Sequence, residues 1–297
     1  MKSGFVAVVG RPNVGKSTLV NSLVGEKVAI TSKRPGTTRS RIRGIITEPA
    51  APAPPSAQAV LVDTPGLHRP RTVLGERLNS IATRVLAEAD AVLMVVDATA
   101  PVGPGDRLVA ARVAEASRPT VVAVTKADIA RQPQIAERLG EAAEWDFDAY
   151  VPVSALRGDG VNVLRREIVG RLDEGPMFFP REMTTDQAEH ILVAEVVREK
   201  FLDRLREELP HALVVVTTSI EERSDSLVVI EADVVVERDS QKGIVIGAGG
   251  SMLRTAGEEA RAELEARFGR QVYLALRARV EPDWQRHPAL IDRLGFE

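Results

Sequence analysis

The segment GRPNVGKST, residues 10–18, constrains the fold more than any other part of the chain. It follows the valine-rich run GFVAVVG, which is typical of a buried strand, and it precedes a predicted helix. The spacing of Gly10, Gly15, Lys16 and Ser17 is that of a phosphate-binding loop, in which glycines let backbone N–H groups turn toward phosphate oxygens. Lys16 would bring positive charge to the β and γ phosphates, and Ser17 would offer a hydroxyl to Mg²⁺. The dipole at the N-terminus of the helix would also favour the phosphates. The predicted nucleotide contacts in this loop are Gly10, Arg11, Pro12, Asn13, Val14, Gly15, Lys16, Ser17 and Thr18.

Short apolar runs alternate with longer amphipathic stretches up to about residue 172. Runs such as AVLMVVD (91–97) and TVVAVT (120–125) suit strands that are buried on both faces of a parallel sheet. Between the runs, apolar residues recur every three or four positions, as in Leu74, Leu78, Ile81, Val85 and Ala89, which predicts helices with one buried side. We therefore predict a doubly wound α/β domain over residues 1–172, with RSRIRGIITE (39–48) as an antiparallel edge strand and the proline-rich stretch 48–58 as an exposed loop.

The bulk composition excludes several classes of protein. The chain of 297 residues has no cysteine, so disulfides and cysteine nucleophiles are excluded, and its four histidines have no metal-ligand spacing. A net charge of −3 restricts any nucleic-acid site to a local patch. No apolar run approaches the roughly 20 residues that span a bilayer, and no signal peptide is recognisable, so we expect a cytoplasmic protein without a transmembrane segment.

The stretch VDTPGL (62–67) supplies the second half of a predicted phosphate and metal site. Asp63 ends a strand and can hold Mg²⁺ through water, and the Gly66 N–H can meet the γ-phosphate and report its loss. Thr37 and Thr38 lie in the loop between the phosphate-binding loop and this stretch, and Thr38 is the preferred metal ligand of the two. The predicted contacts from this stretch are Asp63, Thr64, Pro65, Gly66 and Leu67, and the predicted metal ligands are Ser17, Thr38 and Asp63.

Two later strand ends predict guanine rather than adenine. Asp128 in TKAD can accept hydrogen bonds from guanine N1–H and the N2 amino group, and adenine offers no such donors there. The stem of Lys126 can lie on the base, and Thr125 stands where such motifs usually have asparagine. Ser154 and Ala155 close the pocket with a backbone N–H for the guanine oxygen.

The pattern changes after residue 172. Residues 173–184 contain prolines and glycine around an apolar triplet, Met177 to Phe179, which we interpret as a linker whose triplet packs on one domain. Residues 185–297 then give the order helix, strand, strand, helix, helix, strand, which predicts a smaller α+β domain. Its first helix is expected over about residues 185–208.

These motifs together resemble the TrmE–Era–EngA group of translation-factor-class GTPases, and the whole chain resembles its Era family, with the actinobacterial members nearest. The second domain, around IVIGAGGSMLRTAGEEAR (244–261), resembles a KH domain of the type II form, with Gly247, Ala248, Gly249 and Gly250 as its G-x-x-G loop. This resemblance implies a P-loop GTPase followed by an RNA-binding KH domain. It further implies that the chain binds 16S ribosomal RNA near the 3′ end of that RNA. The small ribosomal subunit is then the expected partner, and assembly of that subunit the expected role.

The resemblance also suggests how water is handled during GTP hydrolysis. Leu67 stands where many GTPases carry a water-orienting glutamine, and leucine cannot hydrogen-bond a water. In relatives, the asparagine that matches Asn13 helps coordinate K⁺ near the phosphates; here Asn13 either does so or only shapes the loop. The predicted catalytic residues are Lys16, Asn13, Thr38 and Gly66. The expected ligands are GTP or GDP and Mg²⁺, together with K⁺ if Asn13 coordinates that ion.

The KH loop departs from its family because it has Ala248 and Gly249 where at least one lysine or similar polar residue is usual. One phosphate contact is therefore expected to be missing, while the site as a whole is kept. Tyr273 and Trp284 are expected to be packing residues. The predicted RNA contacts are Lys242, Ile244, Ile246, Gly247, Ala248, Gly249, Gly250 and Arg254.

Two alternatives to a GTP-controlled RNA-binding switch stay open at this point. The chain could be a KH scaffold whose nucleotide is structural and never turned over, and multiple-turnover phosphate release would separate the two. It could also act at the membrane surface, since relatives associate peripherally, although the sequence shows no basic amphipathic helix. We expect a monomer.

Overall fold

A computed structural model describes residues 1–32, 34, 36–39, 41–49, 53–70 and 72–296. They divide into two compact units, the first comprising nearly all of the described residues of 1–186 and the second residues 187–296 together with residues 32, 34 and 72–74. The predicted domain bounds at 172 and 185 stay predictions. The predicted switch loop, edge strand and proline-rich loop fall partly outside the described residues, at positions 33, 35, 40 and 50–52.

The first unit is built on a six-stranded sheet with the order β2-β3-β1-β4-β5-β6. Every neighbouring pair is parallel except β2 with β3, so the predicted antiparallel edge strand is confirmed. Its elements are β1 Lys2–Val9, α1 Lys16–Val24, β2 Ile42–Glu48, β3 Ala57–Asp63, α2 Val73–Glu88, β4 Ala91–Asp97, α3 Pro104–Ala116, β5 Thr120–Thr125, α4 Gln132–Ala143, β6 Ala149–Pro152 and α5 Val161–Gly170.

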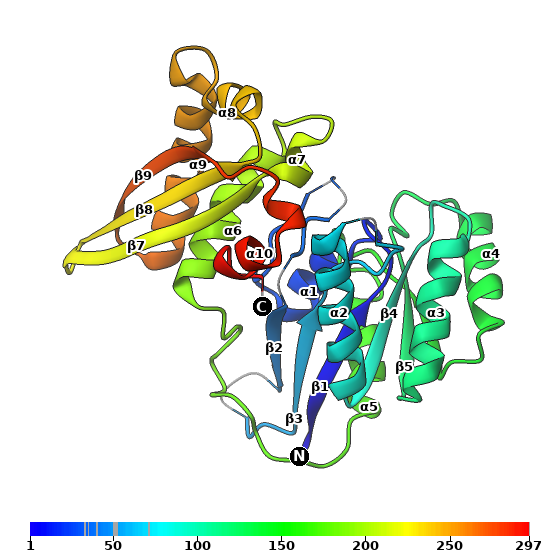
Figure 1. Cartoon of the computed structure of the whole chain (residues 1–297). Coiled ribbons are helices and arrows are strands. Elements are labelled where there is room, and N and C mark those ends of the chain that lie inside the picture. Colours follow the sequence, from blue (N-terminus) through cyan, green and yellow to red (C-terminus); the bar gives the residue numbers. More distant parts are fainter. Residues whose placement is uncertain (33, 35, 40, 50–52, 71, 297) are drawn as a thin grey trace. The chain divides into compact units, whose positions relative to one another are not determined.

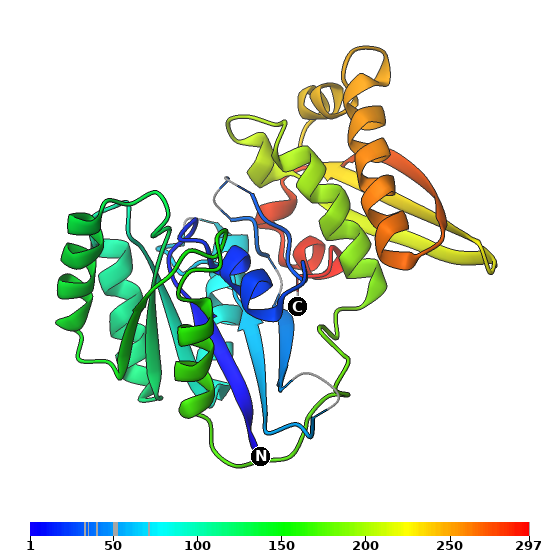
Figure 2. The same cartoon turned by 180° about the vertical axis from the view of Figure 1, so that it is seen from behind.

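Helices cover both faces of this sheet, as the strands' continuous apolar runs require. On one face α2, α3 and α4 pack on residues such as Ala7, Val9 and Met94 (Figure 1). On the other, α1 and α5 pack on Val6, Val8 and neighbouring strand residues (Figure 2). The doubly wound fold is therefore confirmed, and it brings the carboxyl ends of β1, β3 and β5 to one edge, where such folds bind ligands.

The predicted linker is fixed to the first unit by one buried side chain, Gln58. Its amide oxygen accepts the backbone N–H groups of Phe178 and Phe179 at 2.8 and 3.0 Å, and its nitrogen donates to the Phe179 carbonyl. The Phe178 ring lies 5.0 Å from that of Phe5, centroid to centroid. The expectation that the apolar triplet packs on one domain is confirmed for Phe178, which still leaves 42% of its surface exposed.

The second unit has a three-stranded sheet, β7-β8-β9, in which β7 and β8 are antiparallel and β8 and β9 parallel. Helices α6 and α9 pack on one face of it (Figure 2), and alternate β8 residues from Val228 to Val236 are buried beneath them, as predicted. Its elements are α6 Glu189–Leu202, α7 Leu209–Ala212, β7 Val214–Ser224, β8 Leu227–Val236, α8 Asp239–Ile246, the 3₁₀ turn Ala248–Gly250, α9 Ser251–Phe268, β9 Gln271–Val280, the 3₁₀ turn Trp284–Arg286 and α10 Pro288–Arg293.

The predicted order is present with two short helices, α7 and α10, in addition, and the first helix is shorter than the predicted 185–208. It begins at Glu189 and ends at Leu202, and Pro210 belongs to a separate short helix, α7. Glu207 has a left-handed φ of 55°, a conformation that a right-handed helix cannot continue through. The four-residue spacing of apolar residues therefore continues beyond the end of the helix, because Leu205 is buried in the same core although it lies outside the helix.

Candidate nucleotide site and candidate RNA interface

The phosphate-binding loop has the backbone shape that its glycine predicts. Gly15 precedes α1 with φ of 96°, and Asn13 also has a left-handed φ of 66°. A left-handed Gly15 costs little because glycine has no Cβ to clash. The Lys16 amine turns back over the loop and donates to the carbonyls of Gly10 and Arg11 at 3.2 and 3.1 Å. The loop is thus closed around the amine that the sequence assigns to the phosphates.

Burial controls the charge of that amine. Lys16 is 6% exposed, and removal of its ammonium from water lowers its pKa from 10.5 to about 8, although the nearby Asp63 carboxylate favours the charged form. An arriving phosphate would add negative charge beside the amine and favour its protonated state.

The predicted metal ligands lie together at the end of β3. Asp63 Oδ2 accepts hydrogen bonds from the hydroxyls of Ser17 at 2.6 Å and Thr38 at 3.2 Å, and the two hydroxyl oxygens are 2.9 Å apart. Asp63 is fully buried, which raises the pKa of its carboxyl against the opposing effects of Lys16 and these hydrogen bonds. Its second oxygen, Oδ1, is buried and accepts no hydrogen bond from the described residues.

This arrangement fits a magnesium ion. Mg²⁺ takes oxygen ligands, commonly from only one or two carboxylates plus phosphates and water. Ser17, Thr38 and Asp63 offer only oxygens, and the buried Asp63 Oδ1 is a carboxylate oxygen in need of a cation. The structure therefore brings together the three residues that the sequence predicted as metal ligands.

The DTPG stretch is attached to the phosphate-binding loop by close backbone contacts. The Leu67 N–H donates to the Gly10 carbonyl at 3.2 Å, and a Cβ on Gly66 would lie only 2.7 Å from the Pro12 nitrogen. The Thr64 hydroxyl donates to the Val8 carbonyl at 2.8 Å. Only glycine at position 66 permits this close approach to Pro12.

Leu67 is buried in the apolar core on the α2–α4 face of the sheet, with 5% of its surface exposed. Its side chain packs with residues such as Val9 and Val102, so it is neither polar nor solvent-facing. The next residue, His68, is held by Asn79 of α2, whose amide accepts the His68 N–H at 3.4 Å and donates to its carbonyl at 2.5 Å. The sequence showed no signal for this bracing of the loop by Asn79.

The predicted base-reading residues also lie together, at the ends of β5 and β6. The Ser154 hydroxyl donates to Asp128 Oδ1 at 2.9 Å and accepts the Arg157 N–H, which joins the two loops. Asp128 Oδ2 has no partner among the described residues, and Ala155 lies half-buried beside Ser154. Asp128 thus keeps an oxygen for a base.

Lys126 and Thr125 have partners that the sequence did not reveal. The Lys126 amine lies 2.6 Å from Asp97 Oδ2. Burial alone would raise the pKa of Asp97, but hydrogen bonds from Lys126 and Thr99 bring it below its usual value. Thr125 is buried, and its hydroxyl lies 2.6 Å from the Val14 carbonyl and 3.0 Å from the Val96 carbonyl.

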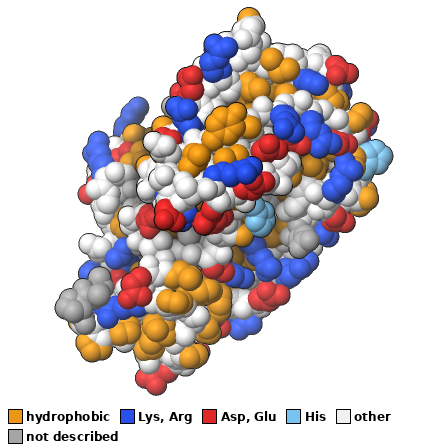
Figure 3. Space-filling model, turned by 90° about the vertical axis from the view of Figure 1, so that its left-hand side faces the viewer, with side chains coloured by type: hydrophobic (Ala, Val, Ile, Leu, Met, Phe, Trp, Pro, Cys, Tyr) orange, Lys and Arg blue, Asp and Glu red, His pale blue; other side chains and the backbone are white. Residues whose placement is uncertain are grey.

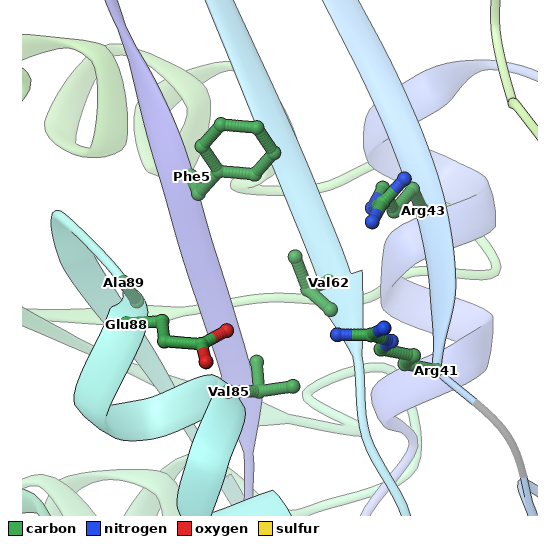
Figure 4. Close-up of a pocket in the computed structure, with 7 residues that line it drawn as sticks. All are labelled: Phe5, Arg41, Arg43, Val62, Val85, Glu88 and Ala89. Carbon is green, nitrogen blue, oxygen red and sulfur yellow. The ribbon is translucent and has the colours of Figure 1, made fainter. Parts of the chain in front are cut away.

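A separate depression lies beside α2 on the sheet of the first unit (Figure 4). Arg41 and Arg43 lie on its β2 side and Glu88 on its α2 side, with Val62 and Val85 between them. Arg43 is paired with Asp186. None of the predicted nucleotide contacts lines this depression, so it is distinct from the phosphate and base sites.

The glycine loop of the second unit lies between α8 and α9. Gly247, Gly249 and Gly250 have φ of 76°, 58° and 79°, and a Cβ on Gly247 would lie 2.8 Å from the Met252 nitrogen. Ala248 and Gly249 are exposed, and Ile244 of α8 is 52% exposed. Lys242 and Ile246 are half-buried on α8, while Arg254 is exposed on α9.

A groove runs beside this loop between α9 and β9. Gly250 and Arg254 line it, and so do residues outside the predicted set: Leu253, Gly257, Glu258, Arg261, Tyr273, Leu274 and Leu276. The expectation that Tyr273 is a packing residue is wrong, because 62% of its surface is exposed. Trp284 does pack as expected: it is fully buried and donates to the Ala212 carbonyl at 2.9 Å.

Comparison with known proteins identifies both units. The sequence pattern of the family described as "50S ribosome-binding GTPase" matches residues 5–126, and that of the "KH domain" matches residues 208–285. GTPase Era of Nocardioides sp. is 48% identical over 307 residues, which cover 99% of this chain and 96% of that protein. The chain belongs to the Era family of GTPases. GTPase Era of Mycolicibacterium smegmatis, at 46% identity, covers 99% of both chains.

Solved structures of the Era family agree with this fold over its whole length. An Era variant from Aquifex aeolicus bound to GDP·AlF₄⁻ is 38% identical, with a TM-score of 0.94 over 100% of this chain and 99% of that one. Era in complex with MgGDPNP and nucleotides 1506–1542 of 16S ribosomal RNA has the same identity, coverage and TM-score. The P-loop GTPase unit followed by a KH unit is therefore confirmed. Among the residues that the structure describes, no helix combines the length and apolar character needed to traverse a bilayer.

Proposed function

We propose that this chain is a GTP-hydrolysing switch that binds 16S ribosomal RNA near its 3′ end through its KH unit and assists assembly of the small ribosomal subunit. The observation that carries the proposal is the joint placement of Lys16, the Ser17–Thr38–Asp63 group and Asp128 at one edge of the sheet. The full-length likeness to an Era complex with a GTP analogue and 16S RNA supports it. One family pattern is described by the 50S subunit, but it covers only residues 5–126, whereas the complex that matches the whole chain contains RNA of the small subunit.

The nucleotide site assigns a task to each residue. Ser17, Thr38 and Asp63 would hold Mg²⁺, which neutralises charge on the phosphates. Lys16 binds the β and γ phosphates, and Gly66 offers its N–H to the γ-phosphate while it lies against Pro12. Loss of the γ-phosphate would release Gly66 and Thr38 together, because both depend on the same phosphate and metal.

Water orientation is assigned to backbone groups near Thr37 and Thr38, and the offset of phosphate charge is assigned to a cation at Asn13. Leu67 cannot contribute, because its side chain is apolar and buried. We propose K⁺ as that cation, held by Asn13 beside the phosphates, where it would offset charge as an arginine does in other GTPases. Turnover in K⁺ should then exceed turnover in Na⁺ at equal ionic strength, and Asn13→Ala should remove the difference. Equal rates in the two salts would reject K⁺.

The base site reads guanine through Asp128. Ser154 occupies one carboxylate oxygen and holds the side chain in place, so the orientation of the other oxygen is fixed before nucleotide arrives. Such pre-organisation favours GTP and GDP over ATP. We place this function in the cytoplasm with the chain as a monomer; a peripheral membrane association has no support in its described surface.

Two measurements on the full-length chain test the proposal. The first is phosphate release from excess GTP with Mg²⁺; many turnovers per chain are expected, and a single turnover or none would favour a scaffold with a structural nucleotide. The second is binding of a labelled RNA with the sequence of nucleotides 1506–1542 in the presence of GDPNP or GDP. RNA should prefer the GDPNP form, and GDPNP should bind more tightly when RNA is present, because coupling between sites is reciprocal. RNA affinity that is the same in both nucleotide states would contradict the switch.

A further inference from the structure

The depression between α2 and β2 of the first unit has no task in the proposed function (Figure 4). Its volume is about 300 Å³, which is at the small end of the range for ligand pockets. Its floor is apolar and consists of Phe5, Val62, Val85 and Ala89, of which the last three are at most 5% exposed. Such a floor favours an apolar group of a ligand, because that group leaves water when it binds.

Two opposite charges face each other across this floor. Arg41 directly precedes β2, and Glu88 is the last residue of α2. Figure 4 shows the two side chains pointing toward one another, with Val62 and Val85 between them. Both residues are exposed, and within the described part of the chain neither makes a hydrogen bond or an ion pair. The depression therefore has a donor on one side and an acceptor on the other, and both are uncommitted.

This separation of opposite charges differs from other surface charges of the chain. Arg43, which also lines the depression, is already paired with Asp186. Figure 3 shows one face of the molecule, on which Lys and Arg side chains lie among Asp and Glu side chains. Arg41 and Glu88 instead have apolar side chains between them. A ligand that fits there must offer an acceptor to the guanidinium and a donor to the carboxylate.

We propose that this depression is a docking site for an extended peptide segment of a protein partner. The segment places one large apolar side chain on the floor, and its backbone lies between Arg41 and Glu88. A peptide backbone carries both groups that these side chains need, a carbonyl acceptor for Arg41 and an N–H donor for Glu88. A nucleic-acid phosphate or an anionic lipid headgroup would meet Arg41 favourably, but Glu88 would repel its negative charge.

The walls of the depression are joined to segments that sense the γ-phosphate in the proposed function, on which this step rests. Arg41 lies three residues after Thr38, and Val62 directly precedes Asp63. The Thr38 hydroxyl donates to Asp63 at 3.2 Å, so the two segments are tied at the metal site. Loss of the γ-phosphate would release Thr38 and shift Arg41. The peptide therefore binds the GTP form more tightly than the GDP form, and it stabilises that form in return.

The test selects phage-displayed random peptides on the full-length, GDPNP-bound chain, after depletion on a Glu88→Trp variant whose indole fills the depression. The peptides that remain should share a large apolar residue, and its replacement by alanine should weaken binding roughly ten- to a hundredfold. A fluorescent copy of one such peptide is then titrated with variants of the chain. Arg41→Gln and Glu88→Gln should each weaken binding at least about tenfold, as expected for a hydrogen bond to a charged group. Arg84→Gln, an exposed arginine of α2 outside the depression, is the matched control and should change nothing.

Several results would overturn the docking site. It is wrong if no peptide survives the depletion, or if Arg41→Gln and Glu88→Gln bind the peptide as Arg84→Gln does. The same variants are tested with phosphatidylglycerol vesicles and with the labelled 1506–1542 RNA. Binding of either that weakens in Arg41→Gln but strengthens in Glu88→Gln would assign the depression to an anionic surface instead of a peptide. Arg41 and Glu88 are exposed, so thermal melting of the variants should match that of the unchanged chain.

The nucleotide dependence is tested with the same fluorescent peptide. Tighter binding to the GDPNP form than to the GDP form supports the coupling, and equal binding would overturn it. Phosphate release and RNA binding by the unchanged chain are measured separately, and their failure would overturn the proposed function. Peptide binding that is lost in Arg41→Gln but kept in Arg84→Gln supports the docking site whatever those two measurements give.

Discussion

The nucleotide site and the groove between α9 and β9 are built in opposite ways. At the phosphate end of the nucleotide site the charged groups are buried before any ligand arrives: Lys16 is 6% exposed and Asp63 is fully buried. In the groove, Arg254, Arg261 and Tyr273 are all exposed. A buried charge costs free energy that its neighbours offset only in part, so we expect the loss of Lys16 or Asp63 to be costly for nucleotide binding. Exposed groups cost little and contribute little each, so RNA affinity is spread over several residues. Single substitutions of these buried charged groups should therefore have larger effects on nucleotide binding than single substitutions in the groove have on RNA binding.

The largest effect is expected at Asp128. Asp128→Asn replaces a double acceptor with an amide whose NH₂ group would face the donors of guanine. GTP affinity should fall about a thousandfold or more, because a polar site left unpaired rejects its ligand strongly. Xanthosine triphosphate, which has a carbonyl where guanine has an amino group, should bind more tightly than before. Competition of GTP, XTP and ATP against a fluorescent GDP measures this, with Glu144→Gln as a surface-carboxylate control. Unchanged GTP affinity would remove the guanine assignment.

A second large effect is expected where the two halves of the phosphate site meet. Gly66→Ala would place a Cβ 2.7 Å from the Pro12 nitrogen and 2.8 Å from its Cα, which are backbone atoms, so Gly66 must move away. We expect the rate of GTP turnover to fall about 10²- to 10³-fold, as when one transition-state hydrogen-bond donor is lost. GDP affinity should change less than about threefold. Gly140→Ala in α4, where a Cβ meets no atom within 4 Å, is the matched control. Equal turnover by the two variants would show that the contact is unimportant.

An intermediate effect is expected from pH, through Lys16. In the free chain its pKa is lowered to about 8, so below that value the amine is charged and above it the amine is neutral. Bound phosphate favours the charged form, so binding above pH 8 takes up a proton and weakens about tenfold per pH unit. Magnesium-free GDP affinity should be nearly constant from pH 7 to 8 and fall roughly tenfold by pH 9. Lys16→Met should bind weakly and with a flat profile over this range; a similar fall in that variant would assign the titration to another group.

The same contrast explains how much could be predicted from the sequence. The phosphate-binding loop, Asp63 and Asp128 follow strand ends in a fixed order, and parallel strands bring their carboxyl ends to one edge, so their convergence could be predicted. The placement of Tyr273 beside Arg261 in the groove could not be predicted in the same way, because the two residues belong to different elements and no fixed spacing links them. For Tyr273 the signal was present: its phase in β9 is that of Arg277, not of Leu274. The phase of Tyr273 therefore indicated an exposed side chain, contrary to the expectation that it packs.

Hydrogen-bond and ion-pair partners that depend on tertiary contacts also could not be predicted from the sequence. Asn79 reaches the backbone of His68 across the turn before α2, and Lys126 pairs with Asp97 from a neighbouring strand. The helix predicted over 185–208 ends at Leu202 because the local backbone turns at residues 203–208, and the apolar period gave no sign of this. The spacing of apolar residues indicates which residues are buried, and this is correct for Leu205. It does not indicate which secondary-structure element a buried residue belongs to.

The smallest effect is expected at Thr125, the residue that replaces the usual asparagine. Its hydroxyl has one proton, and two carbonyls, of Val14 at 2.6 Å and Val96 at 3.0 Å, already lie within reach. Thr125 therefore ties the phosphate-binding loop to β4 and has no proton to give a base. Thr125→Val should weaken GTP and GDP equally, by roughly three- to tenfold, the effect of one ordinary hydrogen bond.

Base selectivity distinguishes this role from a base contact. If the hydroxyl only holds the loop, Thr125→Val leaves the ratio of GTP to XTP affinity unchanged, whereas Asp128→Asn shifts it strongly. Thr125→Asn supplies two amide protons, one for the Val14 carbonyl and one free to meet the base, so it should bind guanine nucleotides severalfold more tightly than the unchanged chain. A changed GTP-to-XTP ratio in Thr125→Val would mean that the hydroxyl contacts the base directly. Thr125 would then be a base-reading residue like Asp128. The small loss of affinity in Thr125→Val would report on recognition of the base and not on the position of the phosphate-binding loop.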